Sequence, residues 1–128
     1  MNNNDIVSGF DNQACDYLEI GLTRGRGATM DLLISLKGSI DAYNSDCLRQ
    51  RIRMVIDAGF TRLSFVLSGV DSISSTGVAT FLSLQKELEE KGGGITMVNV
   101  PGKIKGVFAL LCLQTFFRCI ESLDPENG

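Results

Sequence analysis

Short apolar segments alternate with helical stripes along this chain, and this order constrains the fold more than any other feature of the sequence. Residues 63–67 are mainly apolar and contain neither Gly nor Pro, which is typical of a buried strand. The next segment repeats apolar side chains at helical spacing up to Gly92, and residues 95–98 form a second apolar run. The apolar positions of this predicted helix are Val78, Phe81, Leu82 and Leu88. A strand, a helix and a strand in succession indicate a parallel pair of strands.

The remaining predicted elements follow from the same two patterns, alternation for strands and a stripe every three or four residues for helices. They are strands at 17–22, 32–37 and 115–120, and helices that begin at Asn44 or Ser45 and at Pro101. A short Gly-rich connector joins the first two strands, which predicts a hairpin. The predicted fold class is therefore α/β, a single mixed sheet with helices packed against it.

The predicted helix after Asn44 is amphipathic, and either Asn44 or Ser45 can cap it. It ends at Gly59, and its apolar positions are Leu48, Ile52, Val55 and Ile56. The opposite face carries Arg49, Arg51 and Arg53. These arginines predict a solvated face, with a docking surface for a partner as the alternative.

Length and composition indicate one domain with loosely held ends. The chain has 128 residues, of which 44% are hydrophobic, enough for one core and too few for two. Residues 1–14 are polar apart from Ile6, Val7 and Phe10, and predict a flexible tail. A domain over residues 15–123 and a frayed acidic tail over residues 124–128 complete the predicted organisation.

Charge and residue usage disfavour several classes of function. The formal net charge of −3 disfavours a nucleic-acid partner, and no apolar run approaches the roughly 20 residues of a membrane span. The chain has no His and its four Cys are scattered, which disfavours a metal site and predicts small thiols in a reducing compartment. Neither a phosphate-binding loop motif nor a suitable carboxylate pair is present, so we expect no cofactor and no enzymatic activity. The first residues lack the parts of a signal peptide, so we expect a cytoplasmic protein without direct membrane insertion.

A Ser-rich segment, residues 68–76, is predicted as a turn between the buried strand and the next helix, where open α/β sheets place functional loops. It has four hydroxyls in five positions, Ser72, Ser74, Ser75 and Thr76. In one interpretation these hydroxyls only cap the helix, because they accept from unpaired backbone N–H groups. In the other, one hydroxyl receives a phosphate that the helix dipole and the N–H groups can hold.

Three segments of the sequence resemble the STAS domain of anti-sigma factor antagonists. They are residues 37–44 (KGSIDAYN), residues 67–78 (LSGVDSISSTGV), and the Gly92-Gly93 pair before residues 98–100 (VNV). The most specific part is an Asp-Ser-(Ser/Thr)-Gly signature, which residues 74–77 match in three of four positions, with Ser74 where the family usually has Asp. The resemblance covers about residues 17–123 and implies the STAS fold.

The resemblance also implies a bacterial, non-enzymatic partner switch in transcription regulation. In that family the unmodified protein binds a serine kinase that doubles as an anti-sigma factor, phosphorylation releases it, and a serine phosphatase resets the switch. The phosphorylated serine falls on Ser75, and Asp41 lies in a loop that takes part in kinase recognition. On the hypothesis of such a switch, we expect the other partner-binding residues to be Ser72, Ser74, Thr76, Gly77 and Val78.

Two alternatives remain open on the sequence. One is a non-phosphorylated STAS scaffold, or an accessory subunit of a signalling complex or a membrane transporter, in which the serines only cap the helix. It predicts a stable complex with a partner that is not a kinase. The other is an enzyme acting on a nucleotide, which predicts turnover that is lost in a Ser75→Ala variant.

Overall fold

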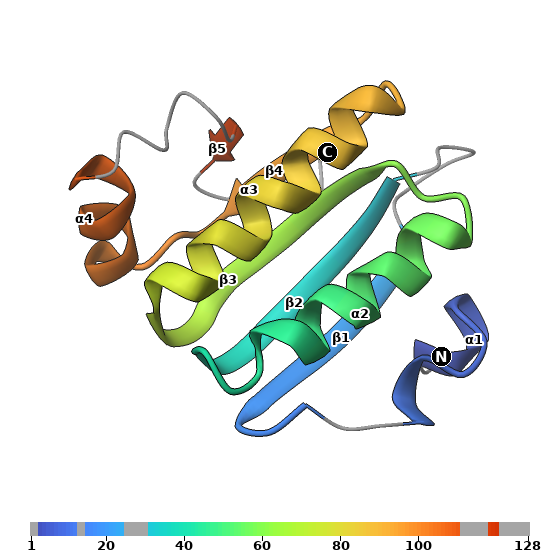
Figure 1. Ribbon diagram of the computed structural model, residues 1–128, viewed down its shortest axis with the longest axis horizontal. Coiled ribbons are helices and arrows are strands. Elements are labelled where there is room, and N and C mark those ends of the chain that lie inside the picture. The colour runs from blue at the N-terminus through green and yellow to red at the C-terminus, as the bar shows by residue number, and fades with distance from the viewer. Residues whose placement is uncertain (1–2, 13–14, 25–30, 111–117, 121–128) are drawn as a thin grey trace.

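A mixed sheet of five strands in sequence order forms the framework of this computed structural model, which describes residues 3–12, 15–24, 31–110 and 118–120 (Figure 1). The strands are β1 (Leu18–Arg24), β2 (Asp31–Ile40), β3 (Arg62–Ile73), β4 (Gly94–Val98) and β5 (Arg118–Ile120). The pair β1 and β2 is antiparallel, and every later pair is parallel. This arrangement confirms the predicted hairpin and the predicted mixed sheet, and residues 115–117 of the predicted last strand lie outside the described residues.

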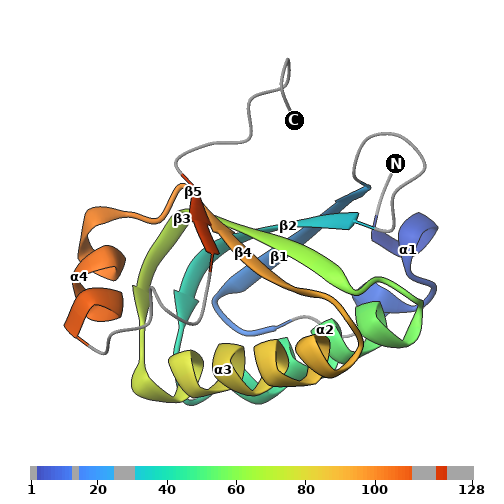
Figure 2. The same cartoon turned by 90° about the horizontal axis from the view of Figure 1, so that it is seen from above.

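Two long helices, α2 (Ser45–Asp57) and α3 (Ser75–Glu90), cover one face of the sheet side by side (Figure 2). An ion pair of 2.7 Å between Arg53 and Glu87 links them at the surface. The shorter α4 (Gly102–Leu110) follows β4 and lies beside the carboxyl end of β3 (Figure 1). In the described ranges no helix combines the length and the apolar character that crossing a bilayer requires.

The core lies between the sheet and the two long helices because strand alternation and helical stripes bury the same faces. In β2, Leu32, Ile34 and Leu36 are buried, whereas the side chains between them are not. The ring of Phe65 on β3 meets the ring of Phe81 on α3 edge to face, with centroids 5.0 Å apart. The helical positions predicted to be apolar and inward are buried at Leu48, Ile52, Val55, Ile56, Val78, Phe81 and Leu88.

The N-terminal segment packs against the domain, so the prediction of a loosely held tail is wrong for residues 3–12. This segment forms α1 (Asn3–Ile6) and the short helix η1 (Phe10–Asn12), and it buries Ile6, Val7 and Phe10 in the core. The Asn3 side chain also continues the hydrogen bonding of the edge strand β1. Its Oδ1 accepts from Leu22 N at 2.8 Å, and its Nδ2 donates to Ile20 O at 2.6 Å. Residues 124–128 of the other predicted tail lie outside the described residues.

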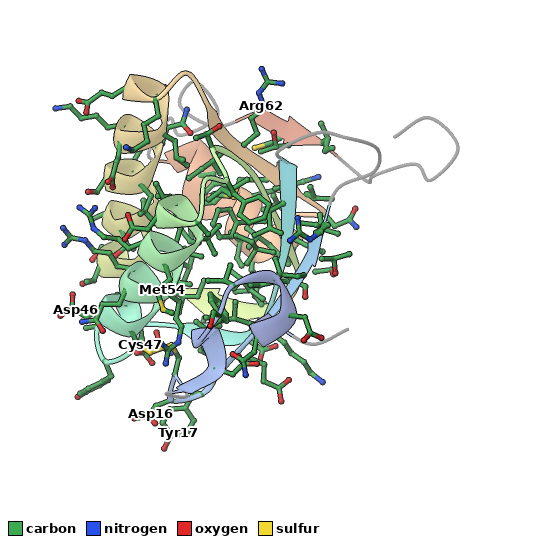
Figure 3. All side chains as sticks on the ribbon, turned by 90° about the vertical axis from the view of Figure 1, so that its right-hand side faces the viewer. Asp16, Tyr17, Asp46, Cys47, Met54 and Arg62 are labelled. Carbon is green, nitrogen blue, oxygen red and sulfur yellow. A yellow bond between two sulfur atoms is a disulfide. The ribbon has the colours of Figure 1, made fainter. Side chains whose placement is uncertain are left out.

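A disulfide between Cys15 and Cys47 joins the N-terminal segment to the first turn of α2, with 5.7 Å between the Cα atoms (Figure 3). The prediction that the cysteines are small thiols is therefore wrong for this pair. Scattered spacing concealed the pairing because disulfide partners are chosen by the fold and not by sequence separation. Cys119, on β5, is exposed, and burial of part of its surface raises the pKa of its thiol.

Removing the disulfide should lower the free energy of unfolding by about 3 kcal/mol, because the bond closes a loop between residues 32 apart in sequence. The measurement is urea unfolding of a Cys47→Ser variant against the oxidised wild type. A Cys119→Ser variant is the control, and we expect it to remain within about 0.5 kcal/mol of wild type. Equal unfolding free energies for Cys47→Ser and wild type would contradict the prediction.

Candidate partner-binding site

Two turns meet at one edge of the sheet because β2 and β3 are parallel neighbours and end level with each other. Ile40, the last residue of β2, pairs with Ile73, the last residue of β3. The turn at residues 41–44 follows β2, and Ser74 with the start of α3 follows β3. Ser74 N donates to Ile40 O at 2.8 Å, so a backbone hydrogen bond joins the start of α3 to the end of β2, where the other turn begins. The fold thus brings Asp41 to the same edge as the predicted cluster of hydroxyls, although the two segments lie far apart in the sequence.

The strand β3 runs to Ile73, so the prediction of a turn over residues 68–76 is wrong for residues 68–73. Pairing with the long strand β2 keeps this Ser-rich segment extended, and Ser72 pairs with Ser39. The pairing of β2 with β3 shifts register between Ser35 and Lys37 and between Gly38 and Ser39. These shifts accommodate the extra residues of β3 relative to β2. The side chains of Asp71 and Ser72 are exposed at the end of the strand, next to the start of α3.

Ser74 caps α3, as one of the two sequence interpretations predicts. It is the N-cap residue with an extended backbone, and its Oγ accepts a hydrogen bond from Gly77 N at 3.1 Å. Ser75 and Thr76 follow in the first helical turn and are exposed. The Ser75 hydroxyl has no hydrogen-bond partner among the described residues. One hydroxyl of the cluster therefore has a structural role, and the next one is presented to solvent.

Gly77 lets the first turn of α3 press onto the ends of β2 and β3. A Cβ atom at this position would lie 2.7 Å from Ile40 Cγ2 and 3.0 Å from Ile73 Cγ1. Gly77 and the next residue, Val78, are both buried in the protein's own core. These two residues, predicted to bind a partner, are therefore covered by the protein's own core, whereas Ser72, Ser75 and Thr76 are exposed.

Asp41 organises the turn before α2. Its Oδ1 accepts from Tyr43 N at 2.9 Å and from Asn44 N at 3.1 Å, the bonding pattern of an Asx turn. Ser45 Oγ donates to the Asp41 carbonyl oxygen. The Asp41 side chain is only half-buried, so the carboxylate both fixes the turn and remains accessible beside the Ser75 end of α3.

Asn44 occupies the N-cap position of α2, but its side chain does not cap the helix as the sequence suggested. The residue is 1% exposed, and its Oδ1 accepts from Asp41 N at 2.9 Å. Its Nδ2 donates to Ser39 O at 2.8 Å and to Asp16 O at 2.7 Å. Asn44 thereby ties the turn to β2 and to the segment before β1. The spacing Asp-x-x-Asn was the signal in the sequence for this role.

Two exposed tyrosines at this edge were missed by the sequence reasoning. Tyr43 in the turn is 90% exposed, and Tyr17 before β1 is 83% exposed. They lie near each other because the residue after Tyr43 is hydrogen-bonded to the residue before Tyr17. Figure 3 shows Tyr17 at the outer surface, at the same end of the molecule as Asp46 at the start of α2. Large aromatic side chains on ordered backbone are common anchors in protein interfaces.

A family model describes this architecture. The model named STAS domain matches residues 23–125. The chain belongs to the STAS domain family. The match covers the sheet from the end of β1 onward and both turns of the site, and it confirms the resemblance that the sequence motifs suggested.

Individual relatives of this STAS domain include anti-sigma factor antagonists. The "Anti-sigma-B factor antagonist" of Bacillus subtilis is 25% identical over 98 residues, which are 77% of this chain and 87% of that protein. A crystal structure of an anti-sigma factor antagonist from Mycobacterium paratuberculosis has a TM-score of 0.74 at 22% identity, over 88% of this chain and 92% of the other. The antagonist SpoIIAA in its unphosphorylated form has a TM-score of 0.66 at 21% identity, over 85% and 94% of the two chains. The structural likenesses confirm the STAS fold.

Proposed function

We propose that this STAS domain is an anti-sigma factor antagonist that is switched by phosphorylation of Ser75. The observation that carries the proposal is the exposed Ser75 hydroxyl in the first turn of α3, directly after the capping Ser74 and next to the Asp41 turn. The name of the Bacillus subtilis relative supports the same function. The proposed partner is an anti-sigma factor with serine-kinase activity, for which this protein is a substrate and not an enzyme.

The geometry explains how one modification can change binding without unfolding the domain. A phosphate on Ser75 adds roughly −1.5 to −2 charge, and the backbone N–H groups and dipole of a helix start favour such an anion. The capping bond of Ser74 and the buried Gly77 keep the turn in place, so the added charge is presented on an ordered surface. Asp41 and Asp71 near this edge already carry negative charge. A partner is released when its contact region offers no positive charge to neutralise the added negative charge.

Exposure and hydrogen bonding support Ser75 over the other hydroxyls of the cluster as the acceptor. Ser74 Oγ is committed to Gly77 N and is half-buried, so its modification would remove the helix cap. Thr76 is exposed but lies farther into the helix, and Ser72 is exposed on the strand β3. We therefore propose Ser75 as the acceptor, with Asp41, Ser72, Ser74 and Thr76 around it in the partner-binding surface.

Phosphate mapping tests the proposal. We expect intact-mass and fragment mass spectrometry of the protein from its own cells to find one added phosphate, located on Ser75. A Ser75→Ala variant should lose that phosphate completely, whereas the matched Ser72→Ala variant should keep it. A protein without phosphate in growth and in stress, in a stable complex with a partner that is not a kinase, would replace this proposal with the scaffold function.

We propose the cytoplasm as the site of action, because sigma factors act on the transcription machinery there. Cytosolic reductants keep most thiols reduced, so in that compartment we expect them to reduce the disulfide between Cys15 and Cys47. The serine phosphatase that resets the switch would act on the same exposed turn. Dephosphorylation of Ser75 then restores the surface that binds the anti-sigma factor.

A further inference from the structure

The disulfide lies beside the Asp41 turn of the proposed partner-binding surface. It joins Cys15, in the segment before β1, to Cys47, in the first turn of the helix that follows the Asp41 turn (Figure 3). Asp16 is the next residue after Cys15, and its carbonyl oxygen accepts from Asn44 Nδ2 at 2.7 Å. A covalent bond and a hydrogen bond therefore connect the same two segments within a few residues of each other.

A short series of hydrogen bonds leads from the disulfide to the Asp41 carboxylate. Asn44 contacts Asp16 through its Nδ2, and its Oδ1 accepts from Asp41 N at 2.9 Å. The Asp41 carboxylate accepts in turn from Tyr43 N and from Asn44 N. A single buried side chain thus links the segment before β1 to the turn. Movement of that segment displaces a hydrogen-bond partner of the residue that holds the turn.

Tyr17 shows that the segment before β1 is held under strain. Its φ is +61°, a left-handed conformation that a bulky residue rarely adopts. Such a conformation persists only where the surrounding structure fixes it. Tyr17 O accepts from Ser39 N at 3.1 Å, Leu18 N donates to Cys15 O at 3.2 Å, and the disulfide fixes Cys15. Cleavage of the disulfide removes the covalent constraint, so Tyr17 and Asp16 can relax away from the turn.

The N-terminal segment has a second attachment to α2, which does not depend on the disulfide. Arg51, one turn after Cys47, is only 6% exposed, so the prediction of a solvated face is wrong for this arginine. Its guanidinium carbon lies 5.9 Å from the centroid of the buried Phe10 ring, a cation–π contact. Cleavage of the disulfide should therefore leave residues 3–12 packed and loosen the segment next to Cys15.

We propose that Cys15 and Cys47 form a redox switch that sets the partner affinity of the Asp41 turn. The inference rests on the proposed function, because the turn belongs to the proposed partner-binding surface. In the oxidised state the turn is ordered before the partner arrives, and an ordered surface loses less conformational entropy on binding. In the reduced state binding must first order the turn, so the affinity is lower. In the reducing cytoplasm the thiol state predominates, and oxidation is the signal that strengthens binding.

The chemistry of the switch is thiol–disulfide exchange with a dithiol reductant. A thiolate of the reductant attacks a sulfur of the disulfide, the S–S bond breaks, and a mixed disulfide forms until the second thiol of the reductant displaces it. Two electrons and two protons pass to the cysteine pair, and the reductant becomes a disulfide. We expect the attack at Cys47, which is half-buried, because Cys15 is only 8% exposed. Oxidised glutathione reverses the reaction and leaves as two thiols.

Hydrogen exchange detected by mass spectrometry tests the switch without a partner. The full-length protein is compared in oxidised glutathione and in dithiothreitol, at labelling times of seconds to minutes. We expect peptides that cover residues 15–18 and 41–47 to exchange about tenfold faster after reduction, while residues 78–88 of α3 stay protected and show that the domain remains folded. Cys47→Ser should resemble the reduced protein in both buffers, and Cys119→Ser should respond as wild type does. Equal exchange in the two states of wild type would overturn the proposal.

Titration calorimetry with the serine-kinase anti-sigma factor tests the coupling to binding. We expect the oxidised protein to bind about tenfold more tightly than the reduced protein. Cys47→Ser should bind with the weaker affinity in both buffers, which controls for any redox response of the partner itself. Equal affinities of oxidised and reduced wild type would overturn the redox switch and leave the proposed function in place. Absence of binding in both states, together with the expected change in exchange, would overturn the proposed function and with it the control of affinity.

Discussion

Replacing Ser75 by Asp should weaken binding to the proposed serine-kinase anti-sigma factor by about 100-fold, or about 2.7 kcal/mol. The exposed hydroxyl lies at the start of α3, where a permanent carboxylate takes the place of the phosphate charge. A charge enclosed in an interface without a partner costs several kilocalories per mole, about 3–5 when a buried pair is broken. Titration calorimetry with the purified partner measures the effect. A Ser75→Ala variant should bind within about twofold of wild type, because it adds no charge.

A second variant separates position from net charge. Ser83 is also exposed on α3, two turns beyond the capped end. Ser83→Asp adds the same charge as Ser75→Asp but away from the proposed interface, so we expect it to bind as wild type does. If Ser75→Asp retains wild-type affinity, the switch is wrong. If both variants lose affinity equally, the effect is one of net charge and the assignment to Ser75 is wrong.

Replacing Gly38 by Ala should lower the free energy of unfolding by about 4 kcal/mol, because strain and a backbone collision add together. Gly38 has φ of +120°, a conformation that L-residues rarely adopt. A Cβ atom there would lie 2.1 Å from the carbonyl oxygen of Tyr17. Backbone cannot move aside as a flexible side chain can, so the hairpin must shift. Urea unfolding of the purified variant measures the loss.

Gly106 provides the matched control for this substitution. It lies in α4, and a Cβ atom at this position would meet nothing within 4 Å. Gly106→Ala should therefore stabilise the protein by up to about 1 kcal/mol, the gain in helix propensity. A Gly38→Ala variant that stays within about 1 kcal/mol of wild type would show that the hairpin tolerates the shift, against the expectation.

The Gly38 contact also bears on the proposed site. Tyr17 O accepts from Ser39 N at 3.1 Å, and the neighbouring Asp16 O accepts from Asn44 Nδ2. These bonds hold the segment before β1 against the turn that contains Asp41. A shift of the hairpin at Gly38 therefore displaces the Asp41 turn, and the Gly38→Ala variant should lose partner affinity as well as stability.

Local signals in the sequence were sufficient for the order of strands and helices from β1 onward. The spacing of apolar residues indicates which face of a helix or strand is buried, and about ten consecutive residues are enough to show that spacing. Ser74 could be assigned as a cap for the same reason, since capping involves only the next three residues. The family motifs around Asp41 and Ser75 were readable because each is a short continuous segment. Their meeting at one edge followed from the parallel order of the strands.

Contacts between distant segments decided the rest. The polar N-terminal segment is held because Phe10 finds a buried place beside Arg51, and no local pattern encodes such a place. The disulfide depends on the approach of Cys15 to Cys47, which the fold creates. The Ser-rich end of β3 is extended because it pairs with β2, although its composition favours a turn. The sequence by itself determined the order of the elements from β1 onward and the motif residues, because those signals are local. The tertiary structure decided the N-terminal helices, the extent of β3, and which residues are buried, paired or exposed, because these depend on contacts between distant segments.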